Sequence, residues 1–144
     1  MGRIIAIDHG TKRVGLAVTD PGQIIATALA TVAAPEAIDF LRAYVARENV
    51  DLFIVGLPKR LDNTPTDNTA PALRFAGDLQ RAFPAIPVEL RDERFTSLLA
   101  RRAIIEAGAK KKQRRDKAAI DRVSAAIILQ SYLERARNTS TLNP

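Results

Sequence analysis

Residues 3–19 read RIIAIDHGTKRVGLAVT, and this stretch decides the architecture of the chain. It contains two apolar segments, 3–8 and 13–19, in which branched aliphatic residues recur in the pattern of strands. A third strand is expected at 23–32, after the turn formed by residues 20–22. Connections this short cannot carry a parallel crossover, so the three strands are expected to form an antiparallel meander.

The first two strands are expected to form a hairpin. Its glycines, Gly10 and Gly15, are expected to permit a tight turn with Thr11, Lys12 and Arg13 at its tip.

The remainder of the chain alternates helical and strand patterns. Helices are expected from Pro35 to about Asn49, from about Thr69 to Phe83, from about Thr96 to Ala107 and from about Ala118 to Arg135; strands are expected at Leu52–Val55 and through Leu90. This order predicts an α/β fold: a mixed five-stranded sheet, with helices on both faces and the first strand at its centre beside the strand that ends at Gly56.

Length and composition indicate one domain, expected at residues 1–137, followed by a polar tail at 138–144. The chain has no cysteine, which excludes disulfides, thiolate metal sites and cysteine nucleophiles. The apolar segment near the N-terminus is too short for a signal sequence or a membrane span, so we expect a cytoplasmic protein that does not contact membranes.

The chain carries a net charge of +6, with 16 arginines and 6 lysines. Guanidinium groups bind phosphate with two parallel hydrogen bonds, and a basic surface attracts nucleic acid by releasing counterions. A basic surface that only keeps the protein in solution explains the composition equally well.

Three acidic residues stand beside apolar segments. Asp8 ends the first strand, Glu93 follows the strand through Leu90, and Asp121 lies inside the last helix. Taken singly, Asp8 could bind turn amides and Asp121 could complement the helix dipole. Taken together, three carboxylates from separate elements could hold two Mg²⁺ or Mn²⁺ ions and support hydrolysis of a phosphodiester bond.

The segments 6–17 (AIDHGTKRVGLA), 55–58 (VGLP) and 92–97 (DERFTS), with Asp121 in the last helix and the IILQ that follows at 127–130, resemble the YqgF family of RuvC-like proteins, described as pre-16S rRNA nucleases or Holliday junction resolvases. The resemblance spans residues 4 to about 134. It implies a ribonuclease H-like fold and a divalent-metal nuclease that processes the 5′ end of precursor 16S rRNA during ribosome biogenesis.

The same resemblance places the catalytic and metal-binding positions of the family on Asp8, Glu93 and Asp121. The chain departs from the family pattern at Asn63, where glycine is usual, and at Ser124, where alanine is usual. Neither departure falls on an acidic position.

Basic residues around these acids are candidates for nucleic-acid binding through phosphate contacts. The candidates are Lys12, Arg13, Lys59, Arg60, Arg94, Lys110, Lys111, Lys112, Arg114 and Arg115. The last five lead directly into the helix that bears Asp121. His9 follows Asp8 on a strand, so its side chain is expected on the opposite face, in a structural or solvent-facing role.

Three alternatives remain open at this stage. The substrate could be branched DNA instead of structured precursor rRNA, or the chain could be an RNA-binding assembly factor without catalysis. The segment 8–11 also resembles the first phosphate loop of actin-like ATPases, which would make the chain a nucleotide-binding phosphotransferase that works as a dimer. For the nuclease, a monomer or a weak homodimer is expected.

Overall fold

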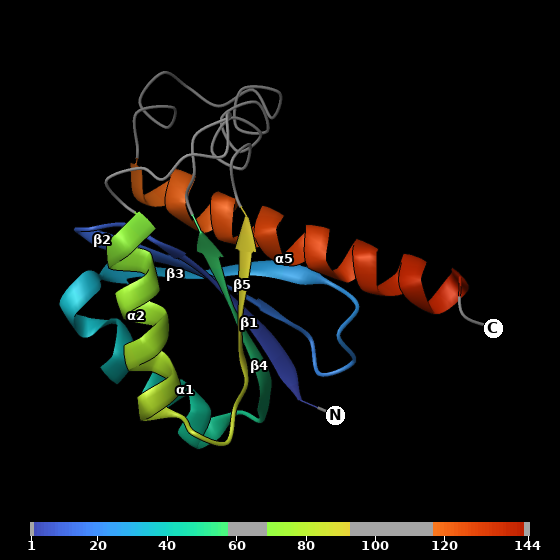
Figure 1. Ribbon diagram of the computed structural model, residues 1–144, viewed down its shortest axis with the longest axis horizontal. Helices are drawn as coiled ribbons and strands as arrows, with labels where there is room; N and C mark the ends of the chain where they lie inside the picture. The colour runs from blue at the N-terminus through green and yellow to red at the C-terminus, as the bar shows by residue number, and fades with distance from the viewer. Residues whose placement is uncertain (1, 58–68, 93–116, 143–144) are drawn as a thin grey trace.

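The computed structural model describes residues 2–57, 69–92 and 117–142, which form a twisted sheet with helices on both faces (Figure 1). In chain order the elements are β1 Arg3–His9, β2 Arg13–Thr19, β3 Ala26–Ala33, a 3-10 turn at Ala34–Glu36, α1 Ala37–Arg47, β4 Val50–Leu57, α2 Thr69–Ala82, β5 Val88–Asp92 and α5 Lys117–Leu142.

The strand order in the sheet is β3-β2-β1-β4-β5. β3, β2 and β1 pair antiparallel, as their short connections require, whereas β4 pairs parallel with β1 and β5 pairs parallel with β4. The arrowheads of β4 and β5 accordingly point the same way in Figure 1. The predicted mixed five-stranded sheet with β1 at its centre is therefore confirmed.

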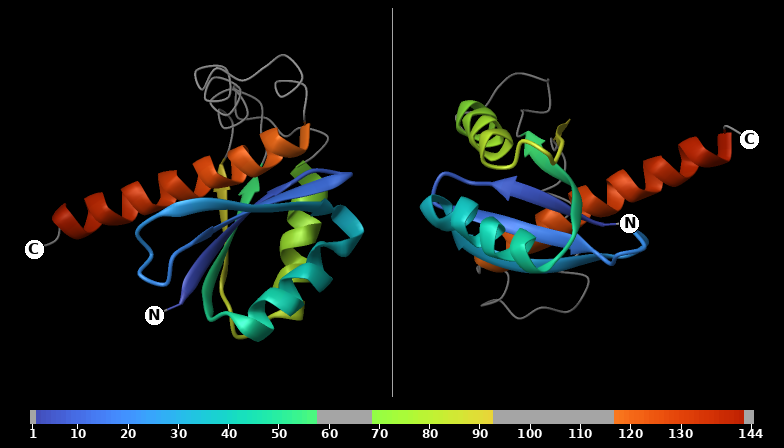
Figure 2. Two further views of the ribbon diagram at one scale, coloured as in Figure 1. Left: turned by 180° about the vertical axis from the view of Figure 1, so that it is seen from behind. Right: turned by 90° about the horizontal axis from the view of Figure 1, so that it is seen from below.

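Alternate residues of β1 contribute to two separate cores. Ile5 and Ile7 are buried among side chains of α1 and α2, whereas Ile4 and Ala6 are buried among side chains of α5. Figure 2 shows α5 on one side of the sheet and α1 with α2 on the other. Because side chains along a strand alternate between faces, Asp8 continues the series of Ile4 and Ala6 and belongs to the α5 face.

The third strand begins at Ala26, three residues later than the sequence predicts. Asp20 accounts for the difference, because its Oδ1 accepts hydrogen bonds from the backbone N–H groups of Ile24 and Ile25, at 2.8 and 2.7 Å. These bonds form a side-chain-capped loop in place of strand pairing. Gln23, with a φ of 58°, occupies the left-handed region in this loop.

The last helix is longer than predicted. α5 continues to Leu142, past the expected end at Arg135, and so includes most of the segment expected to be a polar tail. The physical reason is the absence of a stop signal, since neither glycine nor proline occurs after Gly108 until Pro144. Nothing local in the sequence ends the helix at Arg135.

The helix predicted at 96–107 lies outside the described residues. None of the helices in the described parts of the chain has the length and hydropathy to cross a bilayer.

Candidate active site

Asp8 lies in a row of residues that crosses the whole sheet. It pairs with Gly15 of β2 on one side and with Gly56 of β4 on the other. Gly15 in turn pairs with Thr31 of β3, and Gly56 pairs with Arg91 of β5. Residues paired in this way present their side chains on the same face. The Asp8 carboxylate therefore faces α5, and its paired neighbours on both sides are glycines.

Asp121 of α5 is brought to this row by Gly15. A Cβ atom added at Gly15 would lie 2.2 Å from the backbone oxygen of Asp121 and 2.4 Å from its carbonyl carbon. The backbone of α5 thus packs directly on β2, at the position paired with Asp8. Only a residue without a side chain permits this approach.

The expected role of Gly15 in a tight turn is therefore wrong. Gly15 lies inside β2, and the hairpin is closed instead at Gly10, whose N–H donates to the carbonyl of Arg13 at 2.8 Å. Thr11 and Lys12 lie between β1 and β2 at the tip, as predicted, whereas Arg13, which was also expected at the tip, is the first residue of β2. The turn signal of Gly10 was correct, whereas Gly15 provides room for the helix.

Arg13 connects β2 to the acid on α5. Its Nε donates to Oδ2 of Asp121 at 3.2 Å, and the two side chains keep 39% and 25% of their surface exposed. One residue further along α5, Nη1 of Arg122 donates to Oγ1 of Thr31 at 3.3 Å. Two arginines therefore fasten the first turns of α5 to the meander, and one of them is ion-paired with a candidate catalytic residue.

The third acid, Glu93, directly follows Asp92, the last residue of β5, and lies outside the described residues. The same holds for the candidate phosphate contacts Lys59, Arg60, Arg94, Lys110, Lys111, Lys112, Arg114 and Arg115. Within residues 2–57, 69–92 and 117–142, no three metal-ligating side chains gather. Of the predicted site, the structure describes Asp8 and Asp121, together with Lys12, which is exposed, and Arg13.

The two described acids fit the chemistry of a divalent cation. Both supply hard carboxylate oxygens, which Mg²⁺ and Mn²⁺ prefer, and they come from separate elements, β1 and α5. A cationic group already occupies an oxygen of Asp121, because Arg13 contacts it. Gly15 lets the backbone of α5 at Asp121 approach β2 closely, beside the strand position paired with Asp8. The arrangement therefore suits a positively charged occupant.

His9 lies on the opposite face, as predicted, and its role is structural. Its ring contacts the ring of Phe75 on α2, with 4.9 Å between centroids. Burial, reinforced by the nearby charge of Arg74, lowers the pKa of His9 below its ordinary value. His9 therefore belongs to the core beneath α2 and not to the row of residues that contains Asp8.

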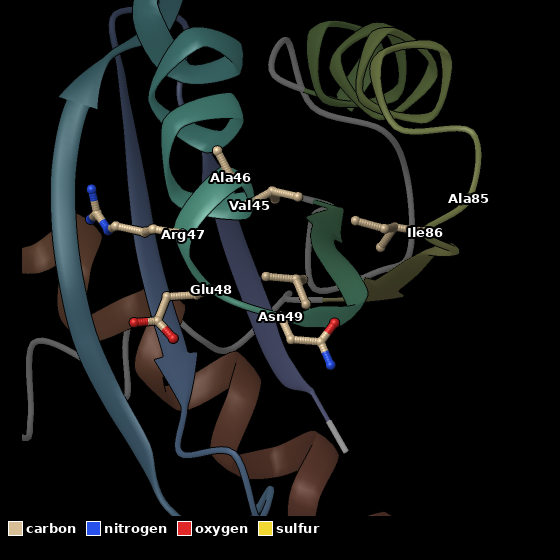
Figure 3. A pocket seen from close by; sticks show the side chains of 8 residues that line it. Val45, Ala46, Arg47, Glu48, Asn49, Ala85 and Ile86 are labelled. Atoms are coloured by element: carbon tan, nitrogen blue, oxygen red, sulfur yellow. The ribbon is translucent and has the colours of Figure 1, made fainter.

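A surface pocket of about 470 Å³ lies elsewhere, at the start of β4 (Figure 3). It is lined by residues 45–50, from the end of α1 into β4, and by residues 85–86 before β5. Asp8 pairs with Gly56 near the other end of β4. This pocket is therefore separate from the row of residues that contains Asp8, and none of the predicted site residues lines it.

The strand order, the acid on the central strand and the last helix that carries a second acid across the sheet define a ribonuclease H-like fold. The fold of this chain is similar to that of "T. thermophilus RuvC in complex with Holliday junction substrate", with a TM-score of 0.53 and 20% sequence identity. The similarity covers 94% of this chain and 96% of that chain.

The chain belongs to the RuvX family, whose model, described as Holliday junction resolvase, matches residues 2–135. It is 53% identical to a protein of Parabacteroides distasonis over 134 residues, with 93% of this chain and 96% of the relative covered. It is 54% identical to a protein of Porphyromonas gingivalis, with 93% and 97% covered. Both relatives carry the name "Putative pre-16S rRNA nuclease".

Proposed function

We propose that this chain is a divalent-metal-dependent nuclease that hydrolyses phosphodiester bonds and processes the 5′ end of precursor 16S rRNA. The observation that carries the proposal is the approach of α5 to Gly15, which brings Asp121 beside the row that contains Asp8. The names of relatives more than 50% identical over most of the chain favour precursor rRNA as the substrate.

Asp8, Glu93 and Asp121 would hold the metal. Glu93 is assigned from the family resemblance and from its place directly after β5, the strand beside β4. Bound Mg²⁺ or Mn²⁺ would activate the attacking water and stabilise the leaving oxygen of the phosphodiester. The protein's part is to fix the carboxylates of Asp8 and Asp121 on two rigid elements, the central strand and the last helix, so that these carboxylates need no rearrangement.

Phosphate binding would come from the basic residues. Lys12 and Arg13 lie at the β1–β2 hairpin, where Arg13 is ion-paired with Asp121, and the remaining candidates lie outside the described residues. Because phosphate contacts carry no base information, we expect binding that depends strongly on salt and weakly on sequence. Specificity for the rRNA end would then rest on RNA shape.

The test compares cleavage of precursor 16S rRNA by the wild type and by Asp8→Asn and Asp121→Asn, with Mg²⁺, with Mn²⁺ and with chelator. We expect metal-dependent cleavage that each variant reduces by at least about 10²-fold, since each loses a charged metal ligand. Asp78→Asn is the matched control, because Asp78 is exposed on α2 and ion-paired with Arg81. Cleavage by Asp8→Asn equal to that of wild type would refute catalysis at this site.

Branched DNA is the second candidate substrate, because the family model is described as Holliday junction resolvase. A four-way junction is therefore included in the same assay. Salt-sensitive RNA binding without cleavage, unchanged by Asp8→Asn, would instead indicate an assembly factor. ATP binding in calorimetry would indicate the nucleotide-binding alternative. We further propose that the protein works in the cytoplasm. We also propose that it is a monomer or weak homodimer, and analytical ultracentrifugation of the pure protein tests this oligomeric state.

A further inference from the structure

Arg13 is the described basic side chain that contacts one of the candidate metal ligands. Its Nε lies 3.2 Å from Oδ2 of Asp121, within hydrogen-bond and ion-pair distance. Arg13 and Gly15 are two residues apart on β2, so their side-chain positions share the α5 face. The guanidinium is therefore held between the hairpin tip and the first turns of α5, next to the row that contains Asp8.

The pair is positioned to exchange partners. Asp121 keeps 25% of its side-chain surface exposed and Arg13 keeps 39%, so water and ions reach both. Ion pairs this exposed contribute little free energy, and a guanidinium leaves such a carboxylate at small cost. A divalent cation held by the Asp121 carboxylate would compete with Arg13 for this carboxylate.

We propose that Arg13 is an exchangeable counter-charge of the active site. Without metal, its guanidinium neutralises Asp121 and keeps the carboxylate oriented. When a divalent cation takes that carboxylate, the guanidinium is released and binds a phosphate oxygen of the nucleic acid. This inference rests on the proposed metal site, and it assigns Arg13 to couple metal binding to nucleic-acid binding.

The location and chemistry of Arg13 suit the second half of this exchange. The distance along β2 from Arg13 to Gly15, the residue paired with Asp8, is about 6.8 Å for two residues of an antiparallel strand. A phosphate held beside Asp8 is therefore near the released side chain. Arginine offers a planar pair of donors to a phosphate, which lysine does not.

The exchange predicts that Arg13→Gln changes two affinities in opposite directions, that for Mn²⁺ and that for RNA. The variant removes the competitor from Asp121, so Mn²⁺ should bind the metal-free protein about 2- to 5-fold more tightly, the range that an exposed ion pair supports. The variant also removes a phosphate contact, so RNA should bind more weakly when Ca²⁺ is present. In chelator, where Asp121 engages Arg13, the loss of RNA affinity should be smaller.

The experiment measures Mn²⁺ affinity by calorimetry and RNA affinity by fluorescence anisotropy, with gels to verify that the RNA stays intact. Lys12→Gln is the matched control, because it removes one positive charge from the adjacent exposed position. It should tighten Mn²⁺ binding less than Arg13→Gln does. Arg13→Lys, which keeps the charge but not the planar fork, should give intermediate Mn²⁺ affinity and serves if Arg13→Gln does not fold.

The outcomes separate this inference from the proposed function. Two results overturn both the proposed metal site and the exchange: weak or absent Mn²⁺ binding by wild type, or an Mn²⁺ affinity of Asp8→Asn equal to that of wild type. If wild type binds Mn²⁺ and Asp8→Asn does not, the metal site stands. In that case, an Arg13→Gln affinity no tighter than that of Lys12→Gln, or an RNA affinity equally reduced with Ca²⁺ and with chelator, overturns the exchange alone.

Discussion

Replacing Gly15 by alanine tests the close approach of α5 to the sheet. The added Cβ would lie 2.2 Å from the backbone oxygen of Asp121, whereas real Cβ atoms essentially never approach within 3.0 Å of another heavy atom. The helix must therefore move by the difference, about 0.8 Å, because the obstacle is backbone and cannot rotate away. Such a shift displaces Asp121 from Asp8 and loosens the packing of Ile128 and Leu129.

The size of the effect follows from these two consequences. Overpacking of this kind lowers the free energy of unfolding by about 1–3 kcal/mol. A displacement near 1 Å at a catalytic group costs up to about 10²-fold in rate. Urea denaturation of Gly15→Ala should therefore give a lower midpoint, and cleavage of precursor rRNA should fall by roughly 10- to 100-fold under conditions where the variant remains folded.

Gly77→Ala is the control for this substitution. Gly77 lies within α2, and an added Cβ would meet only the end of the Arg81 side chain, at 3.6 Å. Alanine is the better helix former, so this variant should gain about 0.5–1 kcal/mol in free energy of unfolding. Equal stability and activity of Gly15→Ala and wild type would refute the direct packing of α5 on β2.

Two further predictions concern local features of the fold. Ser124 is 1% exposed and its Oγ has no hydrogen-bond partner among the described residues. Ser124→Ala should therefore raise the free energy of unfolding by about 1 kcal/mol. The control is Ser131→Ala at an exposed position of α5, and a gain for Ser124→Ala no larger than that of the control would contradict this reasoning. The pKa of Asp20 is lowered by hydrogen bonds from the Ile25 and Ile24 amides, so its charged form stabilises the loop above the ordinary value of 3.8 and the contribution is lost as pH falls through the depressed pKa. The Ile24 and Ile25 amide chemical shifts should report a midpoint below 3.8, and a midpoint at or above this value would contradict the hydrogen bonding.

The sheet could be predicted from sequence because its signals are local. Alternation in β1 and β2, the continuous apolar pattern of β4 and the short connections fix strand type and direction. Alternation also places Asp8 and His9 on opposite faces, which the contact between His9 and Phe75 confirms. These inferences require only neighbouring residues.

The contacts of the candidate site could not be predicted in the same way. Arg13 and Asp121 are 108 residues apart in the chain, and no local pattern pairs them. The requirement for glycine at position 15 comes from the backbone of α5, so the sequence alone suggested a turn. One signal was available: Arg13, Gly15 and Ala17 alternate with the apolar Val14 and Leu16, which marks them as residues of the other face.

The docking of α5 also has a consequence for the order of events during synthesis. β1 and Asp8 are synthesised first, whereas Asp121 is synthesised with the last helix, and a domain generally folds as one unit. Such a distant contact forms late. A nascent chain that has not yet reached α5 lacks Asp121, so the candidate site can be complete only after the last helix has been synthesised.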